Sequence, residues 1–325
     1  MGALDCVSAS KISPTDSTEV FAVDRSDTSL DKTKRDIESQ LLQYKTNSRR
    51  HGIWWTLGVD VPLLSIVATL LGLQQLGMLP QHKSGFFCND PALSYPYLGD
   101  TISMAVIICS IIACPLFLIL ITELVFTDAE QSTRLKLVHS SKKALWLYRS
   151  YAYGLLFNVS IIEVMKAVSG NPRPTFFDIC EPDTAKTCNG SDFVSTFSCT
   201  STRFSAWYQM DSYHSFPSGH TSLSVYCGLF MAWYLQRRAF DWSHRSVFLV
   251  PVLQLICVTY AVVCSLTRIS DHRHHWWDVL TGAVVGIICL VYTVIVLCDN
   301  FSYAEKVNTE DINMTTSQQT TRTTI

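Results

Sequence analysis

Apolar residues gather along the chain into long runs that polar stretches separate. A run of about twenty apolar residues is the length that an α-helix needs to cross the hydrocarbon core of a bilayer. The sequence predicts six membrane-spanning helices of this kind, near residues 54–77, 102–126, 145–168, 219–236, 246–266 and 278–298. The third and fourth runs are the more polar ones, and a helix in the core of a soluble protein is the alternative for those two.

The composition supports a membrane protein. Of the 325 residues, 48% are hydrophobic and only 16% are charged, whereas about 25% of residues are charged in ordinary soluble domains. The net charge of -2 argues neither for nor against nucleic-acid binding, but the lack of a basic tract excludes it as a class of function. We therefore expect an all-α integral membrane protein with six transmembrane helices.

Lysine and arginine are unevenly distributed among the connections between the predicted spans. They concentrate just before the first span, in residues 127–143 and in the link after the fourth span, whereas residues 78–101 contain Lys83 alone. Because basic residues stay on the cytoplasmic side, both termini are predicted to be cytoplasmic. The connections at 78–101, 169–218 and 267–277 then face the cell exterior or the lumen.

This topology divides the chain into three parts. Residues 1–50 form a cytoplasmic tail, residues 51–299 the six-span domain, and residues 300–325 a second cytoplasmic tail. The first tail contains no apolar core of the signal-peptide type, so we expect the first span to act as the targeting signal. The last residues, 323–325, have the Thr-Thr-Ile form that adds a strand to a PDZ domain, although the sequence favours a solvated tail without such a partner.

The predicted outer loops contain two features of an oxidising, extracytoplasmic compartment. Asn189, Gly190 and Ser191 form a glycosylation sequon. Four cysteines also lie in these loops, where disulfides persist: Cys88, Cys180, Cys188 and Cys199. The sequence leaves the pairing among these four open.

Three polar motifs lie at the ends of predicted spans, all on the predicted outer side. KAVSGNPRP starts at the end of the third span, SFPSGHTS leads into the fourth, and TRISDHRHHWWDV connects the fifth and sixth. The residues that we single out in them are Lys166, Arg173, Ser218, Gly219, His220, Arg268, His274 and Asp278. Because all three motifs emerge on one side of the membrane, they can converge on one site.

The cations and the turn in these motifs suit a phosphate group. Lys166, Arg173 and Arg268 carry positive charges, and arginine binds phosphate oxygens in bidentate fashion. The turn at Ser218 and Gly219 enters a helix and exposes backbone N–H groups at the positive end of the helix dipole. We therefore predict a phosphate-binding site.

The two histidines predict a division of roles in phosphoryl transfer. His274 and Asp278 are four residues apart, so they share one face of a helix, and the carboxylate can keep one ring nitrogen protonated while the other attacks. His220 has no such partner in its own motif and is predicted to donate a proton to the leaving oxygen. An interfacial turn or an adventitious metal site is the alternative for the His-rich stretch, although it lacks the His-x-x-x-His spacing of zinc sites on helices.

Together the motifs resemble the three signature motifs of the type 2 phosphatidic acid phosphatase, or lipid phosphate phosphatase, family, and most closely its animal, wunen-like members. The resemblance covers roughly residues 50–300 and includes the segments FFCND, YPY and FFDICEPD of the predicted outer loops. It implies a phosphoric monoester hydrolase that dephosphorylates phosphatidate, lysophosphatidate, sphingoid phosphates and ceramide phosphates. One departure is Thr267, which stands where the family usually has Ser and keeps the hydroxyl.

The resemblance also implies the roles of individual residues. His274 is expected to be the nucleophile that forms a phosphohistidine, Asp278 to orient it and His220 to be the general acid. By the same resemblance the phosphate is held by Lys166, Arg173, Arg268, Ser218 and the backbone of Gly219. The family works without a metal or other cofactor, so none is expected here.

Two other classes of function remain as alternatives. A non-catalytic relative that acts as a membrane scaffold or lipid-binding receptor would be expected to have lost catalytic residues, and none is missing. A metal-binding transporter predicts ligands and helix breaks near the middle of the bilayer rather than chemistry at the ends of spans. We expect a multi-pass protein of the plasma membrane with an extracellular or lumenal active site; the sequence leaves open the preferred lipid, and whether the protein forms a homo-oligomer.

Overall fold

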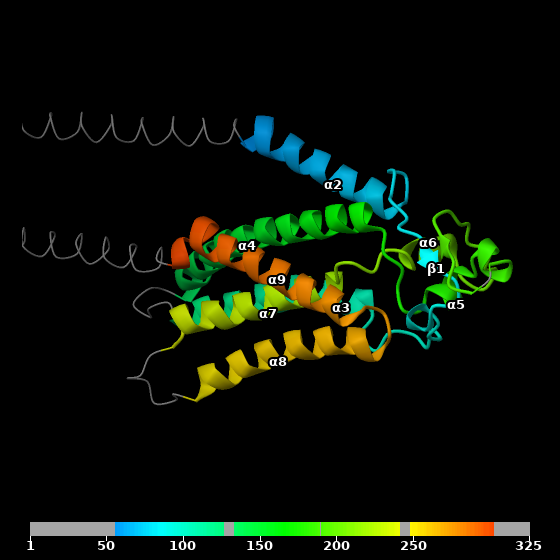
Figure 1. Cartoon of the computed structure of the whole chain (residues 1–325). Helices are drawn as coiled ribbons and strands as arrows, with labels where there is room; N and C mark the ends of the chain where they lie inside the picture. Colours follow the sequence, from blue (N-terminus) through cyan, green and yellow to red (C-terminus); the bar gives the residue numbers. More distant parts are fainter. Residues whose placement is uncertain (1–55, 127–132, 189, 241–247, 302–325) are drawn as a thin grey trace, which may run out of the picture. The chain divides into compact units, whose positions relative to one another are not determined.

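The computed structural model describes residues 56–126, 133–188, 190–240 and 248–301 (Figure 1). The chain divides into two compact units, Met1–Ile66 and Val67–Ile325. Of the first unit the structure describes a π-helical turn, Thr56–Asp60, and the start of helix α2, Val61–Gln75. The predicted sequon asparagine at 189, most of the two tails and the residues of the PDZ motif lie outside the described residues.

The second unit is a bundle of long helices, and most of its short elements gather at one end (Figure 1). Beyond α2, the long helices are α3 (Met104–Phe126), α4 (Thr133–Ser169), α7 (Gly219–Arg238), α8 (Leu249–Ser270) and α9 (Trp276–Tyr292), which continues as a π-helical turn, η4 (Thr293–Leu297). The short elements are β1 (Phe86–Phe87), η2 (Pro91–Leu93), α5 (Phe176–Cys180), η3 (Asp183–Lys186), β2 (Phe193–Val194) and α6 (Ala206–Asp211), with η5 (Asp299–Phe301) after η4. We call the end of the bundle at Ser169, Gly219 and Ser270 the loop end.

Within the described ranges, five helical segments are long and apolar enough to cross a membrane. They are Gly58–Gln75, Met104–Phe126, Lys136–Ser169, Leu249–Ser270 and Trp276–Leu297. The chain is therefore an all-α integral membrane protein, as the apolar runs predict. Helix α4 begins at Thr133, about three turns before the predicted third span, because its basic first turns continue the helix although they are too polar to count as part of an apolar run.

The fourth predicted span corresponds to α7, which is helical but more polar than the five segments above. Helices α3, α8 and α9 all pack against it, and most of its first half is buried, including Thr221, Ser222 and Ser224. A helix surrounded by other helices needs no continuous apolar face toward lipid. This explains why α7 has a lower hydropathy than its neighbours.

Glycines allow α7 to lie unusually close to the helices beside it. A Cβ atom at Gly282 of α9 would lie 2.5 Å from the backbone oxygen of Ser218, and one at Gly286 would lie 2.6 Å from that of Ser222. A Cβ atom at Gly228 of α7 would lie 2.5 Å from the backbone oxygen of Cys257 in α8. Small residues of this kind let helix backbones approach each other in membrane bundles.

Two disulfides join the loop segments, and they settle the pairing that the sequence leaves open. Cys88 pairs with Cys188, across 100 residues of sequence, and Cys180 pairs with Cys199. Strands β1 and β2 pair antiparallel beside them, with Phe86 opposite Val194. A cluster of aromatic rings from Phe86, Phe176 and Phe197 gives the loops a small apolar core of their own.

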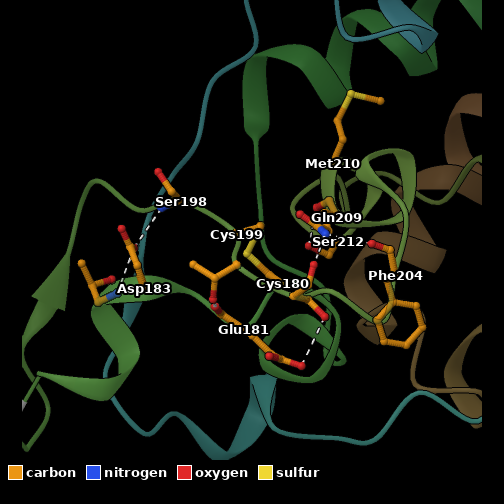
Figure 2. Close-up of a disulfide and its surroundings, with 12 residues drawn as sticks. Cys180, Glu181, Asp183, Ser198, Cys199, Phe204, Gln209, Met210 and Ser212 are labelled. Carbon is orange, nitrogen blue, oxygen red and sulfur yellow. Dashed lines mark hydrogen bonds between the residues drawn. A yellow bond between two sulfur atoms is a disulfide. The ribbon is translucent and has the colours of Figure 1, made fainter.

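The turn after Cys180 fixes the segment that leads to α6 (Figure 2). Glu181 has a left-handed backbone with φ of 46°, and the backbone oxygen of Cys180 accepts hydrogen bonds from the backbone N–H groups of Thr200 and Ser201. The side chain of Gln209 in α6 then donates to the backbone oxygens of Ser201 and Phe204, at 2.7 and 2.8 Å. The disulfide thereby holds α6, and with it Asp211, in place.

Candidate active site

The three sequence motifs meet at the loop end of the bundle. Lys166 lies in the last turn of α4, Ser218 caps α7, Arg268 lies in the last turn of α8, and Asp278 lies in the first turn of α9. Arg173 and His274 come from the connections beside them and are in direct contact. The structure therefore brings together residues that are up to 112 positions apart in the sequence, as Lys166 and Asp278 are.

Arg173 is buried and contacts the ring of His274. Its Nη1 lies 3.0 Å from His274 Nε2 and donates to the backbone oxygen of Arg273 at 2.9 Å. Because a guanidinium has no acceptor, His274 Nε2 must accept this hydrogen bond. A neutral ring of His274 therefore carries its proton on Nδ1, the nitrogen on the side of Asp278.

The surroundings of His274 favour the neutral ring. Burial first, and then the positive charge of Arg173, lower the pKa of His274 from its usual value near 6.5 to about 3, although Asp278 acts in the opposite direction. At neutral pH the ring is uncharged, and a neutral imidazole has the free lone pair that a nucleophile needs.

Asp278 is fixed by groups other than His274. Its Oδ2 accepts hydrogen bonds from the backbone N–H of His275 at 2.9 Å and from the hydroxyl of Ser215, while His274 Nδ1 lies 3.7 Å away. The distance to His274 is that of an ion pair rather than of a good hydrogen bond. The sequence predicts the pairing of His274 with Asp278 but not the contribution of Ser215.

Ser218 and Gly219 begin α7 beside Lys166. Ser218 is fully buried, and its hydroxyl oxygen accepts hydrogen bonds from Thr221 in the first turn of α7. Its backbone N–H donates to the backbone oxygen of Asp278 at 3.0 Å, so this predicted N–H donor is already used by α9. A Cβ atom on Gly219 would lie 3.6 Å from Lys166 Nζ, which places the first residue of α7 directly beside that cation.

Arg268 is 1% exposed and is held by two carboxylates. Its Nη1 pairs with Asp100 Oδ1 and its Nη2 with Asp271 Oδ2, both at 2.9 Å, and Nη2 also donates to the backbone oxygen of Ile102. Only Nε has no partner among the described residues. The sequence predicts the cation here and leaves Asp271 as a supporting residue of the third motif, but it does not mark Asp100.

These contacts belong to one continuous chain of alternating charges. Arg273 pairs with Asp100 at 3.1 Å and with Asp211 at 2.8 Å, and Asp211 pairs with Arg173 at 2.7 Å. In order, the chain is Asp271, Arg268, Asp100, Arg273, Asp211, Arg173 and His274. It connects the first loop, α6 and the third motif to the candidate nucleophile.

Asp211 is the member of this chain that holds Arg173 most firmly. Besides the ion pair, the backbone oxygen of Asp211 accepts a hydrogen bond from Arg173 Nε at 2.7 Å. Burial alone would raise the pKa of the Asp211 carboxyl, but the charges of Arg173 and Arg273 hold the pKa well below its usual range. Asp211 is therefore ionised at neutral pH. Neither Asp100 nor Asp211 belongs to a motif, and both lie between the predicted spans in stretches without a periodic pattern, so nothing in their sequence context marks them.

Several buried polar atoms of the site have no hydrogen-bond partner among the described residues. They are His220 Nε2, His274 Nδ1, Asp278 Oδ1, Arg268 Nε and Arg273 Nη1. Most buried polar atoms in folded proteins are paired, so a group of unpaired ones marks a place where a polar ligand or water completes the site. Within the described ranges no group of three or more His, Cys, Asp or Glu side chains could hold a metal ion; independence from metal stays a prediction.

The loop end of this membrane protein gathers buried cations beside unpaired polar atoms, and comparison with known proteins gives the class. Residues 147–301 match the PAP2 superfamily. Phospholipid phosphatase 2 of Mus musculus is 34% identical over 76% of this chain and 88% of its own, and Phospholipid phosphatase 1 of Rattus norvegicus is 30% identical over 80% and 93%. A putative phosphatidate phosphatase of Drosophila melanogaster is 28% identical over 75% and 70%. No solved structure matches the chain.

The protein belongs to the PAP2, or type 2 phosphatidic acid phosphatase, family. It is accordingly a phosphatase that hydrolyses phosphate esters. The family resemblance of the three motifs is confirmed.

Proposed function

We propose that the protein removes phosphate from lipid phosphates through a phosphohistidine on His274. The observation that carries the proposal is the contact between Arg173 and the neutral, buried ring of His274. It gives the ring the tautomer in which Nε2 has the lone pair, and it places a phosphate-binding guanidinium beside that nitrogen. Nucleophile and phosphate clamp are thus adjacent.

The reaction has two steps. In the first, His274 Nε2 forms a bond to phosphorus, the bond from phosphorus to the lipid oxygen breaks, and His220 gives its proton to that oxygen. In the second, His220 takes a proton from water, the water oxygen bonds to phosphorus, and the bond to His274 breaks. Asp278 stabilises the ring of His274 while it carries the phosphoryl group.

The phosphate oxygens are bound by the cations around His274. Arg173 and Lys166 contact them directly, together with the first turn of α7 at Ser218 and Gly219. Arg268 acts through its charge and its unpaired Nε, since Asp100 and Asp271 occupy its Nη atoms. No metal is required, because the cations supply the charge that a metal would otherwise supply.

The proposed enzyme has six spans, with α7 as the fourth, and both termini in the cytoplasm. The paired cysteines at the loop end support a site on the extracytoplasmic side, since disulfides persist there. We propose the plasma membrane as its location. Phosphatidate, lysophosphatidate, sphingoid phosphates and ceramide phosphates are the proposed substrates.

One assay on the purified full-length protein tests this proposal. Phosphate release from dihexanoyl phosphatidate is expected to continue in excess chelator and to fall by about 10⁴-fold in His274→Ala. His272→Asn is the matched control, because His272 is an exposed member of the same stretch, stacks on Tyr95 and has a positive φ that asparagine tolerates. Loss of activity with chelator, or full activity in His274→Ala, contradicts the mechanism, and an inactive wild-type protein favours a non-catalytic relative.

A further inference from the structure

A groove with apolar walls lies between the second half of α2 and the last turns of α4. Its volume is about 390 Å³, within the range of sites that bind small molecules. The apolar side chains that line it are Val67, Leu70, Leu71, Leu79, Val164, Ala167 and Val168. The structure therefore contains a binding surface of the right size for an apolar chain.

One end of this groove reaches the charged groups of the candidate active site. Gln74 and Glu163 line both the groove and a small polar pocket, and that pocket is also lined by Lys166 and Asp211. Lys166 Nζ lies 3.4 Å from Glu163 Oε1, and Asp211 holds Arg173. The apolar walls thus end where the cations begin.

The length of the groove along α4 also indicates which kind of ligand it can bind. It extends from Val168 to Ser160, which is about 12 Å along a helix axis. One leaflet of a hydrocarbon core about 30 Å thick has a depth of about 15 Å. The groove starts beside Lys166, and its length is less than the depth of one leaflet. These dimensions fit the acyl chain of a lipid whose head group lies at the loop end.

We infer that this groove binds the acyl chain of the lipid phosphate while the phosphate lies at Lys166 and Arg173. The inference rests on the proposed function and adds the surface that recognises the chain. Charge complementarity selects this occupant, because an amphiphile with an anionic head needs apolar walls next to cations. A helix of a partner protein would cover the same apolar walls but would place no phosphate at Lys166.

Variants that fill the groove test the inference. Val164→Trp on α4 and Leu71→Trp on α2 place a large ring in it from opposite walls. Each is expected to lower the ratio of kcat/KM for dipalmitoyl phosphatidate to kcat/KM for dibutyryl phosphatidate by about tenfold, mainly through KM. Val263→Trp on α8 is the matched control: this valine is also exposed in the isolated chain, at 46% against 63% for Val164, but it lines no part of the groove.

The possible outcomes distinguish a loss of acyl-chain binding in the groove from a loss of catalysis. A fall in the ratio in both groove variants and not in Val263→Trp supports the inference. An unchanged ratio in an active, monodisperse groove variant overturns it and places the chain elsewhere. Should one variant fail to fold, the variant on the opposite wall decides. A wild-type protein that hydrolyses neither lipid contradicts the proposed function itself.

Discussion

Two buried clusters of charge lie at opposite ends of the helix bundle, and they differ in how completely they are paired. At the end away from the loops, both carboxylate oxygens of Glu123 are bound, one by Arg238 and Tyr234 and the other by Arg238 and Lys143. At the loop end, by contrast, His220, His274, Asp278, Arg268 and Arg273 each have a buried polar atom without a partner in the part of the chain that the structure describes.

The Glu123 cluster is paired within itself, whereas the loop-end cluster has polar atoms left over for a ligand. Among the described residues of the Glu123 cluster no buried side-chain atom is left unpaired. The cluster therefore has no buried donor or acceptor available for a further polar group. The loop-end cluster has more donors and acceptors than its own members can pair. Burial of charge alone therefore does not identify a candidate site, whereas several unpaired buried atoms gathered on the motif residues do.

Among the changes that compare the two clusters, the largest effect is expected from Arg173→Lys. A lysine keeps the charge but cannot contact Asp211, the backbone oxygen of Arg273 and His274 at the same time, as the guanidinium does. We expect kcat/KM for a short-chain phosphatidate to fall by about a thousandfold, or about 4 kcal/mol. The equivalent change at the other cluster, Arg238→Lys, should leave kcat/KM nearly unchanged. Equal losses in both variants would remove the distinction between the two clusters.

Glu123→Gln is expected to affect stability rather than catalysis. Glu123 is 2% exposed, and removing its charge leaves Arg238 and Lys143 without a counter-charge in a buried position. Breaking a buried pair in this way costs about 3 kcal/mol or more. Thermal denaturation in detergent should therefore show a lower Tm, with kcat/KM of the folded protein preserved. A loss of activity at unchanged Tm would instead connect this cluster to the site.

Asp211→Asn tests whether a residue outside the motifs positions Arg173. Asparagine keeps the size of the side chain and the backbone oxygen but loses the charge that pairs with Arg173 and Arg273. We expect kcat/KM to fall by about a hundredfold, mainly through kcat, and Asp211→Glu to restore part of it. A loss confined to Tm, without a change in kcat, would show that Asp211 is only structural.

The smallest effect concerns the pH dependence of stability. The pKa of His274 is lowered to about 3 by burial and by Arg173, whereas in the unfolded chain it is about 6.5. Between these two values the unfolded state binds the extra proton, so stability is lost as the pH falls below about 6.5, by about 2 kcal/mol at pH 5. Tm should therefore fall less between pH 7 and pH 5 in His274→Gln than in the wild type. Identical changes in Tm would mean that His274 is not buried as a neutral ring.

The long helices could be predicted from the sequence because crossing a bilayer imposes a length and a hydropathy that local sequence records. The three motifs could be predicted as well, because each is one short stretch of sequence at the ends of those helices. Helix α7 was predicted by length, although its polar, buried first half reduces its hydropathy. In these cases each prediction rests on a short stretch of neighbouring residues.

Residues that complete the site from the loops could not be predicted. Asp100 and Asp211 reach Arg268, Arg273 and Arg173 only because the loops are folded by their disulfides and aromatic core. That arrangement depends on contacts between segments far apart in the sequence, so the spacing of residues along the chain does not predict it. The pairing of the four cysteines was undetermined for the same reason.

The close packing at Gly282 and Gly286 has a consequence for exchanging parts between relatives. Because the backbone of α9 lies against that of α7 at Ser218 and Ser222, the two helices form a matched pair that carries His220 on one side and Asp278 on the other. A chimera that takes α7 from one parent and α9 from another would have to reproduce this fit, whereas one that transfers both helices as a cassette would carry the spacing between His220 and Asp278 with it. Recombination points between relatives are therefore best placed outside residues 218–292.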